Sequence, residues 1–93
     1  MCLTGRMTSG ALTAAELRRR LAANVRRLRL GALLTIKQAA GRVGMHWRHW
    51  QKIEAGQNNA TLATIVRLAS ALNVTPAELL AEPPPDSEEP GGV

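Results

Sequence analysis

The chain has 93 residues, enough for one small domain with tails, and it is strongly basic. Twelve Lys and Arg residues against seven Asp and Glu residues give a formal net charge of +5, with a sequence pI of about 11.1. No apolar run approaches the roughly 18 residues of a membrane span, and the start of the sequence lacks the apolar centre of a signal peptide. The single cysteine, Cys2, cannot form an internal disulfide, which suits a reducing compartment. We therefore expect a cytoplasmic protein with no membrane partner.

The charge is unevenly distributed along the chain. The segment from Thr13 to Glu82 contains eleven Lys or Arg residues and four Glu residues, so it carries eleven minus four, or +7. The last eleven residues carry −3, from Asp86, Glu88 and Glu89. A basic folded segment indicates a polyanionic partner, most simply nucleic acid, held in part by salt-sensitive phosphate contacts.

The first helix is predicted from a capping signature and an apolar stripe. Residues 1–12 have no periodicity and are expected to be a flexible lead-in. Thr13 is followed three residues later by Glu16, which is typical of a capping box, so a helix should run from Ala14 to about Leu30. Its buried stripe is predicted at Leu17, Leu21, Val25 and Leu28. The arginines around that stripe form either a solvated face or phosphate contacts: Arg18, Arg19, Arg20, Arg26 and Arg27.

Two short helices joined by a tight turn are predicted next. Thr35 can cap the second helix, which should end near Arg42. The turn covers residues 43–45, and the third helix should begin at His46 or Trp47 and end near Glu54. Glycine adopts positive φ at low cost, so one glycine serves the turn and another caps the end of the third helix: Gly44 and Gly56.

The third helix has two distinct faces. Trp50 and Ile53 are three residues apart and can bury one face, while the small Ala40 allows the second helix to approach closely. The outer face then carries Trp47, Arg48, Gln51 and Lys52. This arrangement predicts a helix-turn-helix whose second helix presents a positive, hydrogen-bonding surface to the major groove.

Two more helices complete the predicted domain. Thr61 caps a fourth helix that ends at Asn73 and Val74, with one apolar face formed by Leu62, Ile65, Val66, Ala69 and Leu72. The segment 75–78 opens a fifth helix with a threonine cap, a proline and a glutamate, and Leu79 and Leu80 should pack on the core. Residues 83–93 are expected to be a disordered acidic Pro/Gly tail. Five helices without a strand signal predict an all-α bundle, with the folded domain at residues 13–82.

The stretch 34–56 resembles the helix-turn-helix of the phage-repressor/Cro-type (XRE) family. The resemblance rests on Leu34-Thr35, Ala40, Gly44-Met45-His46 and Ile53-Glu54-Ala55-Gly56, followed by the Thr-Leu-x-Thr-Ile pattern of residues 61–65. It extends without a gap from about Leu21 to Leu80. It implies a five-helix lambda-repressor-like DNA-binding bundle with the helix-turn-helix as helices 2 and 3.

The resemblance places base-reading positions on Trp47, Arg48 and Lys52, and Gln51 shares their face. The planar fork of Arg48 matches guanine O6 and N7, with a phosphate contact alone as the alternative. Lys52 lies at i+4 from Arg48 and can read a base or hold a phosphate, and Gln51 suits adenine or a phosphate oxygen. Trp47 departs from the small or polar residue usual in the family. It lies against thymine methyls or deoxyribose, or it packs on its own helix or on a partner.

A second set of residues is expected to contact DNA phosphates: Lys37, His46, His49, Gln57, Asn58 and Asn59. The family usually has Gln at Ile36, so Lys37 beside it is expected to supply charge there. His46 stands in for the usual Ser or Thr near the helix start, and His49 can touch a phosphate when protonated. The 57–59 loop offers polar groups to a DNA backbone, although the same residues also suit plain turn chemistry.

Two further positions are expected to be structural. By resemblance, Arg29 and Glu54 form an internal ion pair, which makes Glu54 structural and not a catalytic acid. Leu33 replaces a usual glycine at the end of the first helix. We therefore expect Gly31 to take that turn.

The sequence gives no case for catalysis. His46 and His49 are three residues apart, but no cysteine or further histidine completes a metal site. There is no paired carboxylate, nucleophile elbow, Cys/His dyad or phosphate-binding loop. We expect a non-enzymatic protein with no catalytic residues, no bound metal and no cofactor.

The combined observations predict a sequence-specific, DNA-binding transcriptional regulator. As a repressor-like homodimer it would place two recognition helices in successive major grooves of a pseudo-palindromic duplex. One alternative is an antitoxin-type protein that binds a toxin partner and autoregulates its operon, which the acidic tail from Asp86 to Glu89 favours. Another is an RNA-binding or non-specific nucleic-acid module.

Overall fold

The computed structural model describes residues 12–84. Most of the predicted lead-in and most of the acidic tail therefore lie outside the described residues. The described chain forms five helices and no strand: α1 (Ala14–Gly31), α2 (Ile36–Gly41), α3 (Trp47–Glu54), α4 (Leu62–Leu72) and α5 (Pro76–Leu80). This confirms the all-α five-helix bundle with the helix-turn-helix as its second and third helices.

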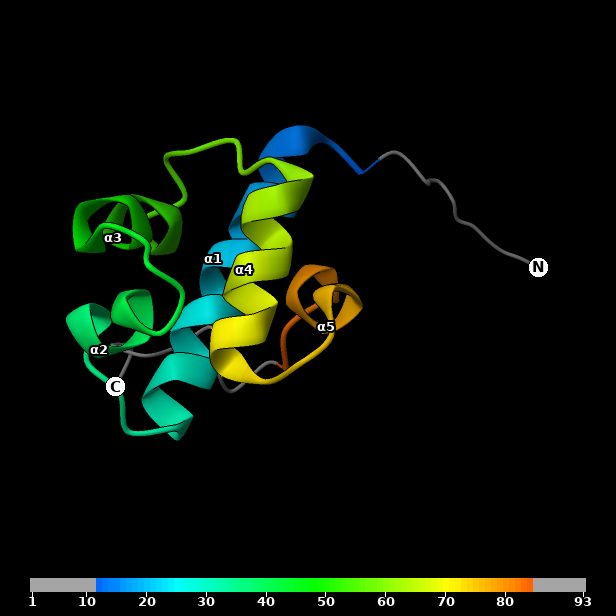
Figure 1. The fold of residues 1–93 in the computed structure, drawn as a ribbon. Coiled ribbons are helices and arrows are strands. Elements are labelled where there is room, and N and C mark those ends of the chain that lie inside the picture. Colours follow the sequence, from blue (N-terminus) through cyan, green and yellow to red (C-terminus); the bar gives the residue numbers. More distant parts are fainter. Residues whose placement is uncertain (1–11, 85–93) are drawn as a thin grey trace.

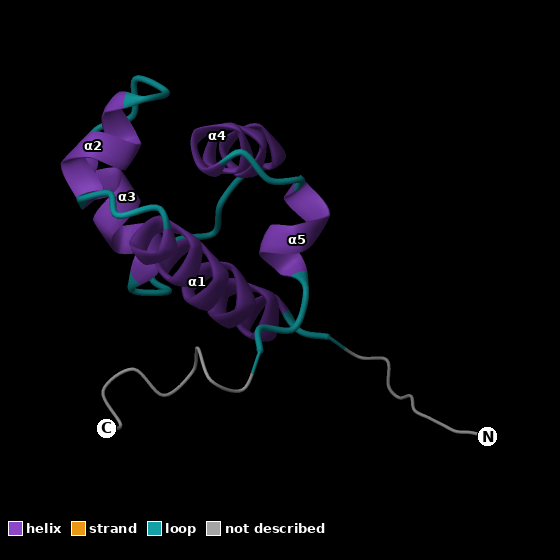
Figure 2. Cartoon of the chain, turned by 90° about the horizontal axis from the view of Figure 1, so that it is seen from below, coloured by secondary structure: helices purple, strands orange, loops and turns teal. Residues whose placement is uncertain are grey.

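The long helix α1 is the element on which the others assemble. It contacts α3, α4 and α5, while α2 contacts α3 and α4. Figure 1 shows α2 and α3 on one side of the α1–α4 pair and α5 on the other. Figure 2 shows the same division from below. The helix-turn-helix therefore forms one edge of the domain, with the outer side of α3 facing away from α1.

The core is built from small and branched apolar side chains around one tryptophan. Trp50 is fully buried, as predicted, and is the largest of the fully buried side chains. Ala39 and Ala40 of α2 are also buried, which lets α2 pack closely. The core cluster consists of Leu21, Val25, Ala39, Ala40, Met45, Trp50, Ile53, Ile65, Leu68, Ala69, Ala71, Leu72 and Leu79.

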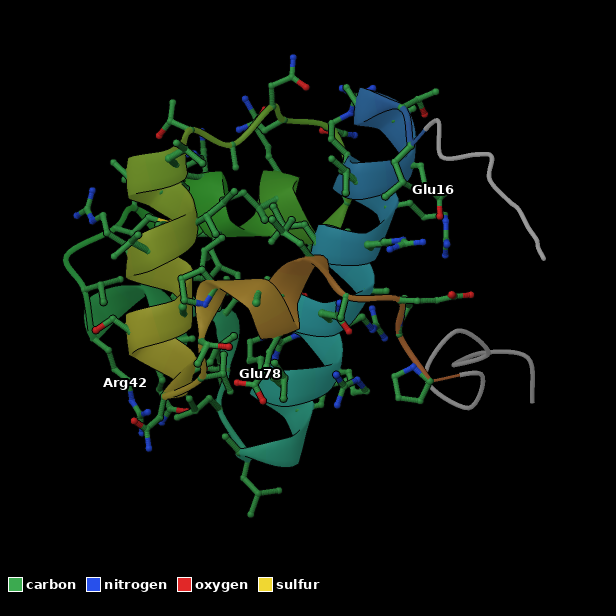
Figure 3. All side chains as sticks on the ribbon, turned by 90° about the vertical axis from the view of Figure 1, so that its right-hand side faces the viewer. Glu16, Arg42 and Glu78 are labelled. Atoms are coloured by element: carbon green, nitrogen blue, oxygen red, sulfur yellow. The ribbon has the colours of Figure 1, made fainter. Side chains whose placement is uncertain are left out.

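A threonine caps the start of four of the five described helices: Thr13, Thr35, Thr61 and Thr75. Thr35 and Thr75 form complete capping boxes, with Gln38 and Glu78 respectively reaching back to the backbone N–H of the cap. Figure 3 shows Glu78 at the surface, on α5. These reciprocal bonds satisfy N–H groups that a helix start leaves unpaired, which is how helices as short as α2 and α5 begin at fixed residues.

The predicted capping box of α1 is only half formed. Thr13 accepts a hydrogen bond from the N–H of Glu16 at 3.0 Å, as expected. The Glu16 carboxylate instead binds Arg19 at 2.7 Å and Arg20 at 3.4 Å. The hydrogen bond from Arg19 lowers the pKa of the Glu16 carboxyl below its ordinary value, with a further contribution from Arg20. Two neighbouring arginines one turn away compete with the helix N-terminus for the same carboxylate.

The end of α5 is tied to the middle of α1 by a buried asparagine. The Asn24 side chain donates to the carbonyl of Leu79 at 2.9 Å and to that of Ala81 at 2.7 Å. Pro83, at which the predicted tail begins, is buried. The packed part of the chain therefore extends past Glu82.

The predicted apolar face of α4 is wrong at two positions. Leu62 is 80% exposed and Val66 is 55% exposed, whereas Leu68, which was not predicted, is fully buried. Ile65, Ala69 and Leu72 are buried as expected. The buried face is rotated toward Leu68, and α4 packs against α1, α2 and α5.

The end of α1 also differs from expectation. Gly31 is the last helical residue, and Leu33 adopts the left-handed conformation, with φ of 61°. The N–H of Leu33 binds the carbonyl of Leu30 at 3.0 Å, and the N–H of Leu34 binds that of Arg29 at 3.1 Å. These two bonds are those of a Schellman motif, which demands positive φ at this position whatever residue stands there.

We predict that Leu33→Gly stabilises the protein by about 1 kcal/mol, because glycine avoids the steric cost that an L side chain meets in the left-handed region. Chemical denaturation followed by circular dichroism measures the free energy of unfolding. Leu33→Ala is the matched control, since it removes the 89% exposed side chain but keeps Cβ, and it should change stability little. Equal gains in both variants would show that the apolar side chain, and not its backbone conformation, carries the cost.

Candidate nucleic-acid interface

The start of α3 is fixed by an imidazole cap. His46 precedes the helix in an extended conformation, and its Nδ1 accepts a hydrogen bond from the N–H of Arg48 at 3.1 Å. The expectation that His46 replaces the usual Ser or Thr at the helix start is confirmed. Its contact with phosphate stays a prediction.

The turn before α3 and the end of α3 use the two predicted glycines. Gly44 has φ of 67° and Gly56 has φ of 73°, both in the region that favours glycine. An arginine from α4 also binds the turn: Arg67 Nη2 donates a hydrogen bond to the carbonyl of Val43 at 2.7 Å. Arg67 was not predicted, since its partner lies 24 residues away in the chain.

The two faces of α3 are divided as the spacing predicts. Trp50 and Ile53 are buried, whereas Arg48, Gln51 and Lys52 are exposed. Trp47 is half-buried at the boundary between the two faces. Three hydrogen-bonding side chains therefore share one solvent-facing surface of the second helix of the helix-turn-helix.

Most arginines outside α3 are committed to other groups of the protein. Within residues 12–84 they bind as follows: Arg18 to Asn59, Arg20 to Glu16, Arg27 to Asn24, Arg29 to Glu54, Arg42 to the carbonyl of Ala71 and Arg67 to that of Val43. Figure 3 shows Arg42 beside the lower end of α4. Apart from Arg26, the α1 arginines are thus not simply a solvated face.

Three cations on the helix-turn-helix are different. The side chains of Lys37, Arg48 and Lys52 form no hydrogen bond or ion pair with any residue in the described range 12–84. The four described carboxylates come from Glu16, Glu54, Glu78 and Glu82, and α3 contributes Glu54 alone. Because Glu54 turns inward to Arg29, the outer surface of α3 has positive charge with no neutralising group of its own.

The indole of Trp47 gathers several of these groups. Lys37 Nζ lies 5.4 Å from the ring centroid, and Arg48 Cζ lies at the same distance. The His46 ring stacks on the indole, with centroids 5.9 Å apart and 24° between the planes. Trp47 and Ile36 also pack against the edge of the core. Of the two expectations for Trp47, packing within the molecule is therefore present.

An ion pair joins α1 to the end of α3. Arg29 Nε lies 2.6 Å from Glu54 Oε2, and Arg29 Nη2 donates to Glu54 Oε1 at 3.0 Å. Trp50 Nε1 donates to Glu54 Oε2 at 2.7 Å, and Arg29 Nη1 donates to the carbonyl of Leu34 at 2.8 Å. The Glu54 carboxylate raises the pKa of Arg29, opposed by desolvation. The structure thus brings together the two residues that the resemblance paired.

The loop after α3 lies between the helix-turn-helix and α1. Gln57 is exposed, Asn58 is half-buried, and the N–H of Gln57 binds the carbonyl of Lys52 at 3.1 Å. The side-chain oxygen of Asn59 accepts a hydrogen bond from Arg18. A phosphate would therefore be bound by the side-chain nitrogen of Asn59. His49 is half-buried on α3. Phosphate contacts by these residues stay predictions.

Two other kinds of site are absent from the described residues. Across 12–84, no three His, Cys, Asp or Glu side chains gather where they could hold a metal ion. None of the helices in that range is both long and apolar enough to cross a membrane.

Comparison with known proteins identifies the domain. A family of helix-turn-helix domains matches residues 14–81. The chain belongs to this family, and to its phage-repressor/Cro (XRE) type. It is a DNA-binding transcriptional regulator of that type. An uncharacterized HTH-type transcriptional regulator, y4dJ, from Sinorhizobium fredii is 32% identical over 78 residues, which cover 84% of this chain and 97% of the relative.

Two solved helix-turn-helix structures are similar. The restriction-modification controller protein C.AhdI from Aeromonas hydrophila is 31% identical, with a TM-score of 0.64 over 67% of this chain and 94% of that one. The hypothetical transcription factor NHTF from Neisseria is 26% identical, with a TM-score of 0.70 over 86% of this chain and 90% of that one.

We predict that Glu54→Ala lowers the free energy of unfolding by about 3 kcal/mol, because it leaves the Arg29 charge buried without its partner. The side chains of Arg29 and Glu54 are only 10% and 7% exposed. Urea denaturation monitored by tryptophan fluorescence measures the loss. The double variant Arg29→Met/Glu54→Gln should recover most of it, since no charge is then buried and the glutamine can still accept from Trp50 Nε1. A loss no larger than that of a surface pair would contradict this account.

Proposed function

We propose that this helix-turn-helix regulator binds specific duplex sequences as a repressor-like homodimer, with α3 in the major groove. The observation that supports the proposal is the set of three uncommitted cations, Lys37, Arg48 and Lys52, on the outer surface of the helix-turn-helix. Binding DNA through them breaks no hydrogen bond or ion pair within the described chain. The arginines of α1 other than Arg26 bind other groups of the protein and offer less.

Base reading is assigned to the exposed surface of α3. Arg48 lies in the first turn of α3, from which its fork can reach guanine O6 and N7. Gln51 and Lys52 follow on the same surface, and Trp47 borders it. Phosphate contacts are assigned to the flanks: Lys37, His46, His49, Gln57, Asn58 and Asn59. These contacts set the position on the duplex, and the base contacts set the sequence.

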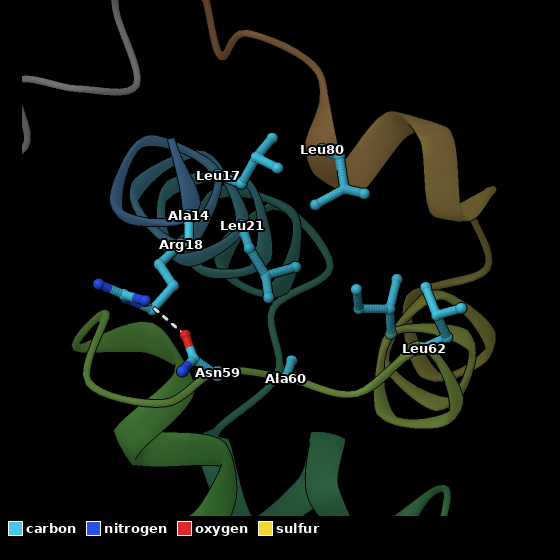
Figure 4. Close-up of a pocket in the computed structure, with 9 residues that line it drawn as sticks. Ala14, Leu17, Arg18, Leu21, Asn59, Ala60, Leu62 and Leu80 are labelled. Atoms are coloured by element: carbon cyan, nitrogen blue, oxygen red, sulfur yellow. Dashed lines mark hydrogen bonds between the residues drawn. The ribbon is translucent and has the colours of Figure 1, made fainter. Parts of the chain in front are cut away.

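A homodimer is supported by an apolar surface away from α3. A groove of about 240 Å³ lies between α1, α4 and α5. Figure 4 shows Leu17, Leu62 and Leu80 around it. Leu62 and Val66 are exposed one turn apart on α4, and Leu62 lines the groove. Covering these side chains with a second copy would remove apolar area from water and strengthen a small core. We assign the dimer contact to this surface.

We infer that the protein acts in the cytoplasm without catalysing a reaction or binding a cofactor. An antitoxin-type role remains the second candidate for its partners. It rests on the acidic residues Asp86, Glu88 and Glu89, which lie outside the described residues. Co-purification of a small basic protein encoded beside it would favour that role, and DNA binding would continue alongside.

The base-reading assignment predicts a specific effect of Arg48. Duplexes selected by the wild-type protein from a random pool supply the specific probe, and random duplexes of equal length supply the reference. Arg48→Ala should lose about 1–3 kcal/mol on the selected duplex and much less on the reference. Arg48→Lys is the matched control, because it restores charge without the planar fork and should recover reference binding only. Unchanged discrimination in Arg48→Ala would remove Arg48 as a reader.

The dimer assignment predicts that Leu62→Glu gives a folded monomer. Leu62 is already 80% exposed, so the substitution should leave folding intact while placing a charge in the contact. Analytical ultracentrifugation measures the mass. Ser70→Glu adds the same charge at an exposed position of α4 outside the groove and should remain dimeric. If Leu62→Glu keeps the wild-type mass of a dimer, the contact lies elsewhere.

A further inference from the structure

The ring of Trp47 is the point where the two helices of the helix-turn-helix present their charges together. Lys37 comes from the first turn of α2 and Arg48 from the first turn of α3. Both cationic groups lie 5.4 Å from the centroid of the same indole. Neither side chain has a carboxylate or a hydrogen-bonding partner among the described residues. The indole is thus the group that holds each of them in place.

Bringing two positive side chains to one place is unfavourable unless something offsets their repulsion. The negative face of an indole attracts cations, and tryptophan is the best of the aromatic side chains at this. Trp47 itself is half-buried against the core, and the His46 ring stacks on it, so the indole cannot follow the cations as they move. A fixed ring with two long side chains on it restricts the rotamers that Lys37 and Arg48 would otherwise sample.

We propose that Trp47 is a positioning residue, which holds Lys37 of α2 and Arg48 of α3 in the arrangement that DNA requires. This inference rests on the proposed function. Trp47 increases affinity because the side chains are ordered before binding, and so less conformational freedom is lost when the complex forms. It also couples the two helices, since a shift of α2 relative to α3 would draw one cation off the ring.

The first test uses the free protein and needs no DNA. Protons near an aromatic face are shifted upfield in NMR spectra, so the ε-methylene protons of Lys37 and the δ-methylene protons of Arg48 should be shifted in the wild type. Both shifts should disappear in Trp47→Leu and be reduced in Trp47→Phe. Unshifted Lys37 and Arg48 protons in the wild type would overturn the proposal.

The second test is a set of mutant cycles on the selected duplex. Trp47→Leu should weaken binding about tenfold, and Trp47→Phe should recover part of the loss. In the background Lys37→Ala/Arg48→Ala, Trp47→Leu should have no further effect. Lys52→Ala is the matched control: it removes an exposed cation of α3 that does not lie on the indole, so its effect should add to that of Trp47→Leu.

The outcomes separate the possibilities. If Trp47→Leu still costs tenfold in the background without Lys37 and Arg48, Trp47 contacts DNA itself and the positioning role is overturned, while the proposed function stands. If the loss in Trp47→Leu matches a loss of folded protein in denaturation, and Trp47→Phe binds as the wild type does, the role is core packing and the proposal again fails. If wild-type protein selects no duplex at low ionic strength, the proposed function fails and takes this inference with it.

Discussion

The ion pair between Arg29 and Glu54 determines where α3 sits, and the exposed surface of α3 depends on it. The guanidinium reaches from α1 to the last residue of α3 and also binds the chain at Leu34, just before α2. Trp50 donates to the same carboxylate from one turn earlier, so the core and the ion pair are fixed to each other. A partly buried pair adds little net stability by itself, but its geometry is demanding. Together with the buried Trp50 and Ile53, it sets the rotation of α3 that turns Glu54 to the inner side.

That rotation has an electrostatic consequence. The only carboxylate of α3 is neutralised on the inner side, so the outer side keeps Arg48 and Lys52 with no opposing charge. On α1 the opposite arrangement holds, since Glu16, Asn24 and Asn59 bind arginines that would otherwise be free. The net charge of the chain is therefore a poorer guide to DNA binding than the contacts that its individual cations make. The cations that can turn most freely toward DNA are those that no carboxylate, amide or carbonyl of the described chain binds.

The features predicted correctly are those that depend on residues close together in the chain. The threonine caps, Gly44 and Gly56 meet backbone requirements within a few residues, and Trp50 and Ile53 are set by helical spacing. Gln38 could have been found the same way, because Thr35 with Gln38 is a capping-box pattern. The failures are of another kind. Helical spacing shows which residues of α4 share a face, but not how that face is turned relative to the core. Leu62 and Val66 were therefore wrongly expected on the buried face. Arg67 and Asn24 bind partners far along the chain, and the left-handed Leu33 follows from backbone bonding that a leucine does not signal.

The departures from the usual family pattern are connected in space. Ile36 replaces a glutamine and packs on the core edge, so α2 loses a hydrogen-bonding side chain where it would face DNA. The adjacent Lys37 lies on Trp47, itself a replacement for a small or polar residue. A directional hydrogen-bonding scheme at the junction of α2 and α3 is thus exchanged for apolar packing and cation–π attraction. Both interactions tolerate small displacements, so the junction of α2 and α3 is held by shape and charge and not by directional hydrogen bonds.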